Sequence, residues 1–152
     1  MPPATSPSDS PYVLEHSLGH LATRFSKAVL RRIADALRQG GYPVTSEQWT
    51  VLVHVWAVEG QTQRALGEKL LKEKTNVARL VSSLEGLGYL TRGPGESDGR
   101  EKRIFLTEQG RTAMQGMTGV VQAILDASAA GIDARELETC KRVLRLASLN
   151  LK

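Results

Sequence analysis

The chain has 152 residues and a formal net charge of +4, and 41% of its residues are hydrophobic. Length and composition are those of an ordinary globular protein with one domain, and no stretch has the apolar length of a membrane span. The single cysteine, Cys140, excludes an internal disulfide framework, and the modest basic excess is compatible with a polyanionic partner without establishing one.

Residues 1–11 are rich in proline and serine, and we expect them to form a disordered tail. They have neither the basic nor the apolar stretch of a signal peptide, so we expect a cytoplasmic protein. From Tyr12 to Leu37 apolar residues recur at steps of three and four, which predicts one helix of about seven turns within 12–41. This helix carries more apolar surface than one small core needs, which indicates a second partner for it.

Three shorter helices are expected next, and each follows a threonine that can accept a hydrogen bond from the first turn. Thr45 and Gln48 have the spacing of a capping box. Thr62 precedes the second of these helices and Thr75 precedes the third. Gly88 is expected to end the third helix, because glycine readily adopts the left-handed conformation of a helix stop.

Two short apolar segments, 89–91 and 103–107, bracket a loop that is full of turn-forming residues. This pattern predicts a β-hairpin with a long tip. The second segment is apolar toward its end but is preceded by Arg100, Lys102 and Arg103. We therefore expect the hairpin to be anchored in the core at one end and to project a basic wing at the other.

After Thr107, a further candidate cap, the apolar pattern predicts two helices within 108–152, separated at Gly131. Helix, short turn, helix and hairpin is the order of a winged helix-turn-helix, which we place at 45–107. The predicted fold is therefore mainly α with a small β-hairpin wing. The flanking helices, within 12–41 and the C-terminal segment, have more apolar surface than the winged unit can cover, so we expect them to dimerise.

The outer face of the predicted helix that begins at Thr75 is short and polar, with one arginine and no acidic residue before Glu85. Such a face can enter a major groove, where arginine reads guanine and asparagine reads adenine. The hairpin cations can contact phosphates, and Arg100 is our candidate for insertion into a minor groove. A solvated helix surface also favours serine and asparagine, so that alternative stays open. The predicted DNA-binding residues are Thr75, Asn76, Ala78, Arg79, Ser82, Arg92, Asp98, Arg100, Lys102 and Arg103.

One central segment, LGEKLLKEKTNVARLVSSLEGLGYLTRGPGESDGREKRIFLTEQG, carries a set of spaced motifs. The motifs are Leu84-Glu85 with Gly88, Arg92, Asp98-x-Arg100 and Leu106-Thr107-x-x-Gly110. In these features the segment resembles the MarR family of bacterial transcriptional regulators. With the Thr-x-x-Gln helix start upstream, the resemblance covers residues 45–112, and helices of fitting length flank it.

The resemblance implies a homodimer with intertwined first and last helices and two winged units over a pseudo-palindromic operator in double-stranded DNA. The residues that it places against bases are Thr75, Asn76, Ala78 and Arg79. It also implies that Arg100 enters the minor groove with Asp98 as its pairing partner, although from the residues alone Asp98 could equally well shape the turn. Gly99 stands where the family commonly has a second arginine, which predicts a less charged wing tip.

Relatives of this kind commonly bind a small aromatic or anionic effector between the dimer helices and the winged unit. The residues that could line such a pocket here are Tyr12, His16, His20, Trp49, His54 and Trp56. Tryptophans at this spacing are also typical of a core. His16 and His20 are four residues apart and could share a metal with His54 or Glu15, but such pairs arise by chance, and we predict neither a metal nor a cofactor.

The sequence contains no glycine-rich phosphate loop, no nucleophile triad and no paired carboxylates in a pocket motif, so we do not expect an enzyme. The expected function is that of a sequence-specific DNA-binding regulator, a repressor released by a small molecule. The alternatives are a metal- or redox-responsive regulator of the same fold, with Cys140 as the thiol, and a winged-helix module that binds another protein.

Overall fold

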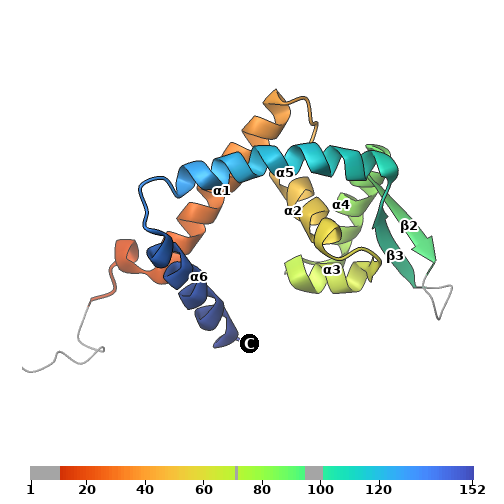
Figure 1. The fold of residues 1–152 in the computed structure, drawn as a ribbon. Coiled ribbons are helices and arrows are strands. Elements are labelled where there is room, and N and C mark those ends of the chain that lie inside the picture. The colour runs from red at the N-terminus through yellow and green to blue at the C-terminus, as the bar shows by residue number, and fades with distance from the viewer. Residues whose placement is uncertain (1–10, 71, 95–100) are drawn as a thin grey trace, which may run out of the picture.

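A computed structural model describes residues 11–70, 72–94 and 101–152 (Figure 1). In chain order the elements are η1 (Leu14–His16), α1 (Leu18–Gln39), α2 (Ser46–Ala57), β1 (Gln61–Thr62), α3 (Gln63–Leu70), α4 (Lys74–Gly86), β2 (Leu90–Pro94), β3 (Lys102–Leu106), α5 (Glu108–Ser128) and α6 (Ala134–Leu149). The predicted mainly α fold with a hairpin wing is confirmed. Among the described residues, none of the helices combines the length and the hydropathy that crossing a lipid bilayer requires.

The helix caps expected at three threonines are present. The Thr45 hydroxyl accepts from the backbone N–H of Gln48 at 3.1 Å, and the Gln48 amide oxygen accepts from the backbone N–H of Thr45 at 3.0 Å. Thr62 and Thr107 each accept from the backbone N–H three residues further on, at 3.1 and 2.9 Å. These bonds satisfy N–H groups that have no partner within the helix, and they fix where α2, α3 and α5 begin.

Two predicted helix starts are wrong. The long first helix begins at Leu18 instead of near Tyr12, because Ser17 is extended and caps α1 by accepting from the backbone N–H of His20 at 3.4 Å. A short 3₁₀ turn precedes it. Thr75 does not cap α4, since the helix already begins at Lys74 and the residue at its cap position makes no side-chain bond to it.

The sheet has three antiparallel strands in the order β1-β3-β2, where the sequence predicted two. Strand β1 has only two residues, too few for an apolar alternation to show in the sequence. Ile104 at the centre of β3 pairs with Gln61 of β1 on one side and with Arg92 of β2 on the other. The start of α3 is therefore tied to the base of the wing, which is the hairpin of β2 and β3.

The hydrophobic core lies inside the winged unit and extends to the helices that flank it. It joins the C-terminal part of α1 (Ile33, Leu37) to α2, α3, α4, the sheet and the part of α5 up to Val121. In Figure 1, α5 runs from the root of the wing across the molecule, and α6 lies at the end away from the wing. No residue of α6 is buried. The first half of α1 exposes Leu18, Leu21 and Phe25, each at about half of its surface.

Candidate nucleic-acid interface

Helix α4 presents one polar face to solvent because its other face is fixed in the core. Its buried residues are Val77, Leu80, Val81 and Leu84. The residues predicted to meet DNA bases lie on the opposite side: Thr75, Arg79 and Ser82 are exposed, and Asn76 and Ala78 are half-buried. The spacing of the apolar residues therefore predicted the outward face of this helix correctly.

Two residues of this face are joined by a hydrogen bond. The guanidinium of Arg79 donates from Nη2 to Oδ1 of Asn76 at 2.7 Å, across one turn of the helix. Among the described residues, Arg79 forms no ion pair with a carboxylate. Its charge is therefore not neutralised by the protein at the surface of α4.

Arg92 of β2 is used inside the protein. Its guanidinium donates to the carboxylate of Glu85, the amide oxygen of Gln63 at 3.0 Å, and the carbonyl of Ala78 and the hydroxyl of Ser82 at 3.3 Å each. These acceptors come from α3 and α4, and the side chain of Arg92 is only 21% exposed. Arg92 was predicted to contact DNA, but in the structure it connects the wing to the two helices beside it.

The side chain of Arg103 also binds within the protein. Its Nη1 donates to the carbonyl of Gly60 at 2.8 Å, and its Nε is buried with no hydrogen-bond partner among the described residues. Lys102, its neighbour on β3, is exposed. Asp98 and Arg100, the two residues predicted for the wing tip, lie outside the described residues.

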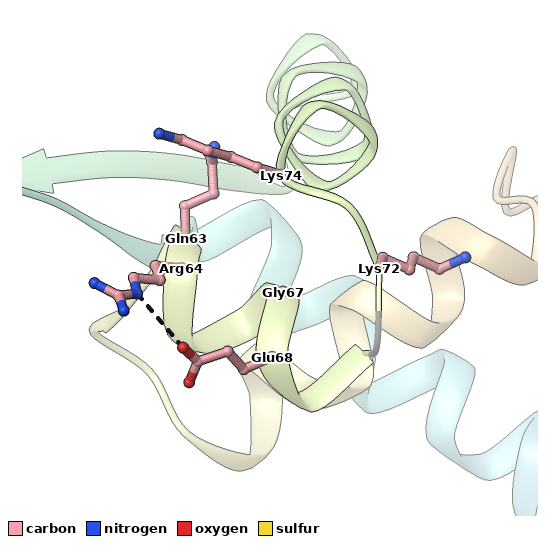
Figure 2. Close-up of a pocket in the computed structure, with 6 residues that line it drawn as sticks. All are labelled: Gln63, Arg64, Gly67, Glu68, Lys72 and Lys74. Atoms are coloured by element: carbon pink, nitrogen blue, oxygen red, sulfur yellow. Dashed lines mark ion pairs between the residues drawn. The ribbon is translucent and has the colours of Figure 1, made fainter.

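A basic groove runs beside the start of α3. One cavity of about 630 Å³ is lined by Gln63, Arg64, Gly67, Glu68, Lys72 and Lys74 (Figure 2). A second hollow, of about 480 Å³, shares three of these residues and continues to the wing at Arg92 and Lys102. We call the two together the α3 groove. It joins the N-terminal ends of α3 and α4 to β3, so Arg64, Lys74 and Lys102 line one continuous hollow.

The cations of the α3 groove differ in how firmly the protein holds them. Arg64 pairs with Glu68 at 3.4 Å, but both side chains are at least 70% exposed, so the pair contributes little and Arg64 can exchange its partner. Figure 2 shows Lys72 pointing away from Arg64 and Lys74. It pairs at 3.4 Å with Glu47 of α2. Arg64 was not predicted, because an arginine in the first turn of a helix gives no signal of its own in the sequence.

The root of the wing is joined to α5 through Glu59. Its carboxylate accepts from both terminal nitrogens of Arg111 at 3.0 Å and from the backbone N–H of Leu106 at 3.0 Å. The hydrogen bond from Arg111 lowers the pKa of Glu59, and the Leu106 N–H acts in the same direction against the effect of burial. One carboxylate thus fixes the end of β3 to the first turn of α5.

The residues predicted for an effector pocket do not share one of the described cavities. Trp49 is a core residue, Trp56 is 37% exposed and Tyr12 is 77% exposed. His54 on α2 has its Nδ1 2.7 Å from the carbonyl of Thr50, which holds its ring against its own helix. From the sequence, a core tryptophan such as Trp49 could not be distinguished from one that lines a pocket.

The alternative in which His16 and His20 share a metal, which the sequence did not favour, depended on one continuous helix. His16 ends the 3₁₀ turn and His20 lies in the first turn of α1, with extended Ser17 between them. The two imidazoles therefore lack the spacing of neighbours on one helix face. Within the described residues no group of three or more His, Cys, Asp or Glu side chains could hold a metal ion.

Comparisons with known proteins agree with this geometry. The sequence profile of the MarR family matches residues 41–101. The HTH-type transcriptional regulator PrsX of Escherichia coli is 30% identical over 106 residues, which cover 68% of this chain and 63% of PrsX. The chain thus spans less than two thirds of the length of this relative.

Two solved structures resemble the whole fold. CouR from Rhodococcus jostii RHA1, bound to p-coumaroyl-CoA, superposes with a TM-score of 0.77 and 26% identity, over 89% of this chain and 94% of CouR. A MarR transcriptional regulator from Methanosarcina mazei Go1 superposes with a TM-score of 0.80, over 89% of this chain and 98% of that one. Its identity of 22% supports likeness of fold alone.

Proposed function

Because the chain belongs to the MarR family of transcriptional regulators, we propose that it is a sequence-specific DNA-binding regulator that reads its operator through α4. The observation that carries the proposal is the outer face of α4, where Asn76 and an unneutralised Arg79 lie at the N-terminal half of the helix. Recognition helices of this kind contact base edges with their N-terminal residues. No catalytic step is part of this function.

Phosphate contacts are assigned to the cations around that face. Arg64 and Lys74 of the α3 groove and Lys102 of β3 are exposed, so they can meet a DNA backbone without losing a strong internal partner. Arg92 and Arg103 act indirectly, because their guanidinium groups bind the protein itself. Asp98 and Arg100 stay predictions from the sequence, as a pairing residue and a minor-groove residue.

The regulator is proposed to act as a homodimer. Exposed apolar residues gather on the first half of α1 and on α6, where Leu144, Leu146 and Leu149 are 37–58% exposed. Burying such surface between two protomers is favourable by about 25 cal/mol per Å². A twofold dimer would place its two α4 helices in major grooves about one helical turn apart, roughly 34–36 Å.

We propose that the dimer represses by occupying a promoter and that a small molecule releases it. CouR, a relative of similar fold, was solved with p-coumaroyl-CoA bound. Here a groove of about 440 Å³ between α1 and α5 has apolar walls that include Phe25 and Ile124 and one cation, Arg32. Those walls and that charge suit an aromatic or anionic effector better than the six residues expected from the sequence. An effector acts only if it binds the two dimer geometries unequally.

Binding to a random duplex at rising salt tests the proposal. A DNA-binding regulator loses affinity steeply, because each phosphate contact contributes about 0.9 to the slope of log K against log salt. Selection from a random duplex library is then expected to enrich a palindrome of about 16–20 bp, the length of two half-sites. Affinity that does not depend on salt, or no binding at low ionic strength, would instead favour a winged-helix module that binds a protein.

A further inference from the structure

The hydrogen bond between Arg79 and Asn76 restricts what α4 can offer to DNA. A guanidinium has donors only, so the atom of Asn76 that it contacts at 2.7 Å is the carbonyl oxygen. The opposite orientation of the amide would place two donors against each other. The side-chain NH₂ of Asn76 is then left to face outward, together with the remaining N–H groups of Arg79.

The rest of the α4 face is less free to read bases. The hydroxyl of Ser82 accepts from Arg92, and the carbonyl of Ala78 accepts from the same guanidinium. Thr75 is exposed in the first turn of α4 and can donate or accept. Apart from Lys74, whose contact is assigned to a phosphate, the charged or amide groups at the N-terminal half of α4 are therefore Asn76 and Arg79, and both offer donors.

We infer that Asn76 and Arg79 act as one reading unit that presents mainly hydrogen-bond donors and therefore selects guanine over adenine. The inference rests on the proposed DNA-binding function. Guanine is the one base with two acceptors, N7 and O6, on its major-groove edge, and a free arginine fork matches both. An asparagine reads adenine by accepting from its N6 amino group while donating to N7, and here one of the two lone pairs of the asparagine oxygen is already used by Arg79, whose positive charge stands beside it.

This reading unit differs from what the sequence alone predicted. Asparagine on a recognition helix was expected to read adenine, because a free amide has both a donor and an acceptor to offer. The bond from Arg79 uses one of the two lone pairs of that acceptor and at the same time orients the guanidinium. Asn76 is then expected to favour an acceptor at the neighbouring position, either the N7 or O6 of guanine or the O4 of thymine.

The test is selection from a random duplex library by the unaltered 152-residue chain, three variants and a control variant. Arg79→Lys keeps the charge but loses the fork. Asn76→Asp keeps an oxygen for Arg79 but has no donor, and Asn76→Ala removes both. Lys74→Gln is the matched control, because its contact is assigned to a phosphate. The readout is the ratio between bases at each position, in which a general change of affinity cancels.

We expect the wild-type protein to prefer guanine by about tenfold at one position in each half-site. At that same position the Arg79→Lys variant should lose most of the preference for guanine. Asn76→Asp should keep that guanine and lose the preference at the neighbouring position, whereas Asn76→Ala should weaken both. Lys74→Gln should leave every ratio unchanged.

Adenine at the position that Asn76→Ala relaxes would overturn the inference and leave the proposed function standing. The same holds if Asn76→Ala leaves the position read by Arg79 unchanged, because Arg79 would then act alone. Failure of the wild-type protein to bind any duplex at low salt would overturn the proposed function, and the reading unit with it.

Discussion

Arg92 and Glu85 form an ion pair that closes the wing onto the outer side of α4. The same guanidinium binds Gln63 at the first residue of α3, so the wing, α3 and α4 meet at one side chain. A charged hydrogen bond in a partly buried place is worth more than an exposed pair. The three elements that would face DNA are therefore held in fixed positions relative to each other before any DNA binds.

Arg92→Gln is expected to lower the affinity for DNA by about tenfold or more, the effect of losing one or two charged hydrogen bonds, while the salt dependence stays the same. The reason is the proposed role of Arg92, whose guanidinium binds Glu85 and Gln63 and would position the reading elements without contacting a phosphate. The measurement is the slope of log K against log salt. The control is Lys74→Gln, for which the slope should fall by about 0.9. A fall of the same size for Arg92→Gln would show that Arg92 contacts DNA directly.

Glu59→Gln is expected to destabilise the fold at neutral pH, and the difference from wild type should disappear in acid. The pKa of Glu59 is lowered below its ordinary value of 4.5 by the hydrogen bond from Arg111. A group with a lowered pKa contributes stability above its unfolded-state pKa and loses it as the pH falls through the folded-state value. The measurement is the denaturant midpoint of wild type and of Glu59→Gln, taken at a series of pH values from 7 to below 4.5. The difference between the two midpoints should shrink as the pH falls.

Glu138→Gln is the matched control for Glu59. The pKa of Glu138 is also lowered, by a hydrogen bond from Lys141, but this pair is exposed on α6 and solvent screens it. Its denaturant midpoint should match that of wild type at every pH. Equal effects of the two substitutions would mean that the joint between the wing and α5 has no special role in stability.

Gly110→Ala should destabilise the protein by about 1–3 kcal/mol or more. A Cβ at position 110 would overlap the backbone carbonyl of Tyr89, which cannot move freely because it accepts from the N–H of Thr107. Gly119→Ala on the same helix meets no atom within 4 Å and should be neutral or stabilising by up to about 1 kcal/mol. Chemical denaturation of both variants measures the difference, and equal stabilities would contradict the close packing of α5 on the wing root.

Leu144→Arg should separate the proposed dimer while the winged unit stays folded. Leu144 is 37% exposed on α6, and a charge there would be buried without a partner if two protomers met on this face. The expected result is a rise of the dimer dissociation constant by at least about tenfold in sedimentation equilibrium. Thr139→Arg, on the other side of the helix, should leave the constant unchanged. A dimer that tolerates Leu144→Arg would place the interface elsewhere.

The local signals in the sequence predicted the helix boundaries of the winged unit well where a side chain interacts with its own helix. Thr45, Thr62 and Thr107 are caps, as their spacing indicated. Such bonds join residues a few positions apart, so the pattern of residue types is sufficient to find them. The buried face of α4 followed for the same reason, because its apolar residues repeat with the period of a helix.

The sequence could not predict which acceptor each charged side chain of the hairpin would bind. Arg92, Arg103 and Lys102 read alike in the hairpin, but in the structure the two arginines bind acceptors from other elements and the lysine is exposed. Gln63 lies 29 residues before Arg92 in the chain, and Gly60 lies 43 residues before Arg103. The packing of the strands against α3 and α4 determines which cation stays exposed, and so which is available for the proposed contacts with DNA.

Helix α5 extends from Glu108, next to the Glu59 joint, to Ser128, at the end where dimer contacts are proposed. With a rise of about 1.5 Å per residue, its 21 residues form a stiff rod roughly 31 Å long, and a tilt of about 5° displaces its far end by nearly 3 Å. That displacement is comparable to the length of a hydrogen bond. A compound that tilted α5 by a few degrees at the proposed dimer contacts would therefore displace the wing by several ångströms relative to a DNA groove. It would do so without contacting the wing itself.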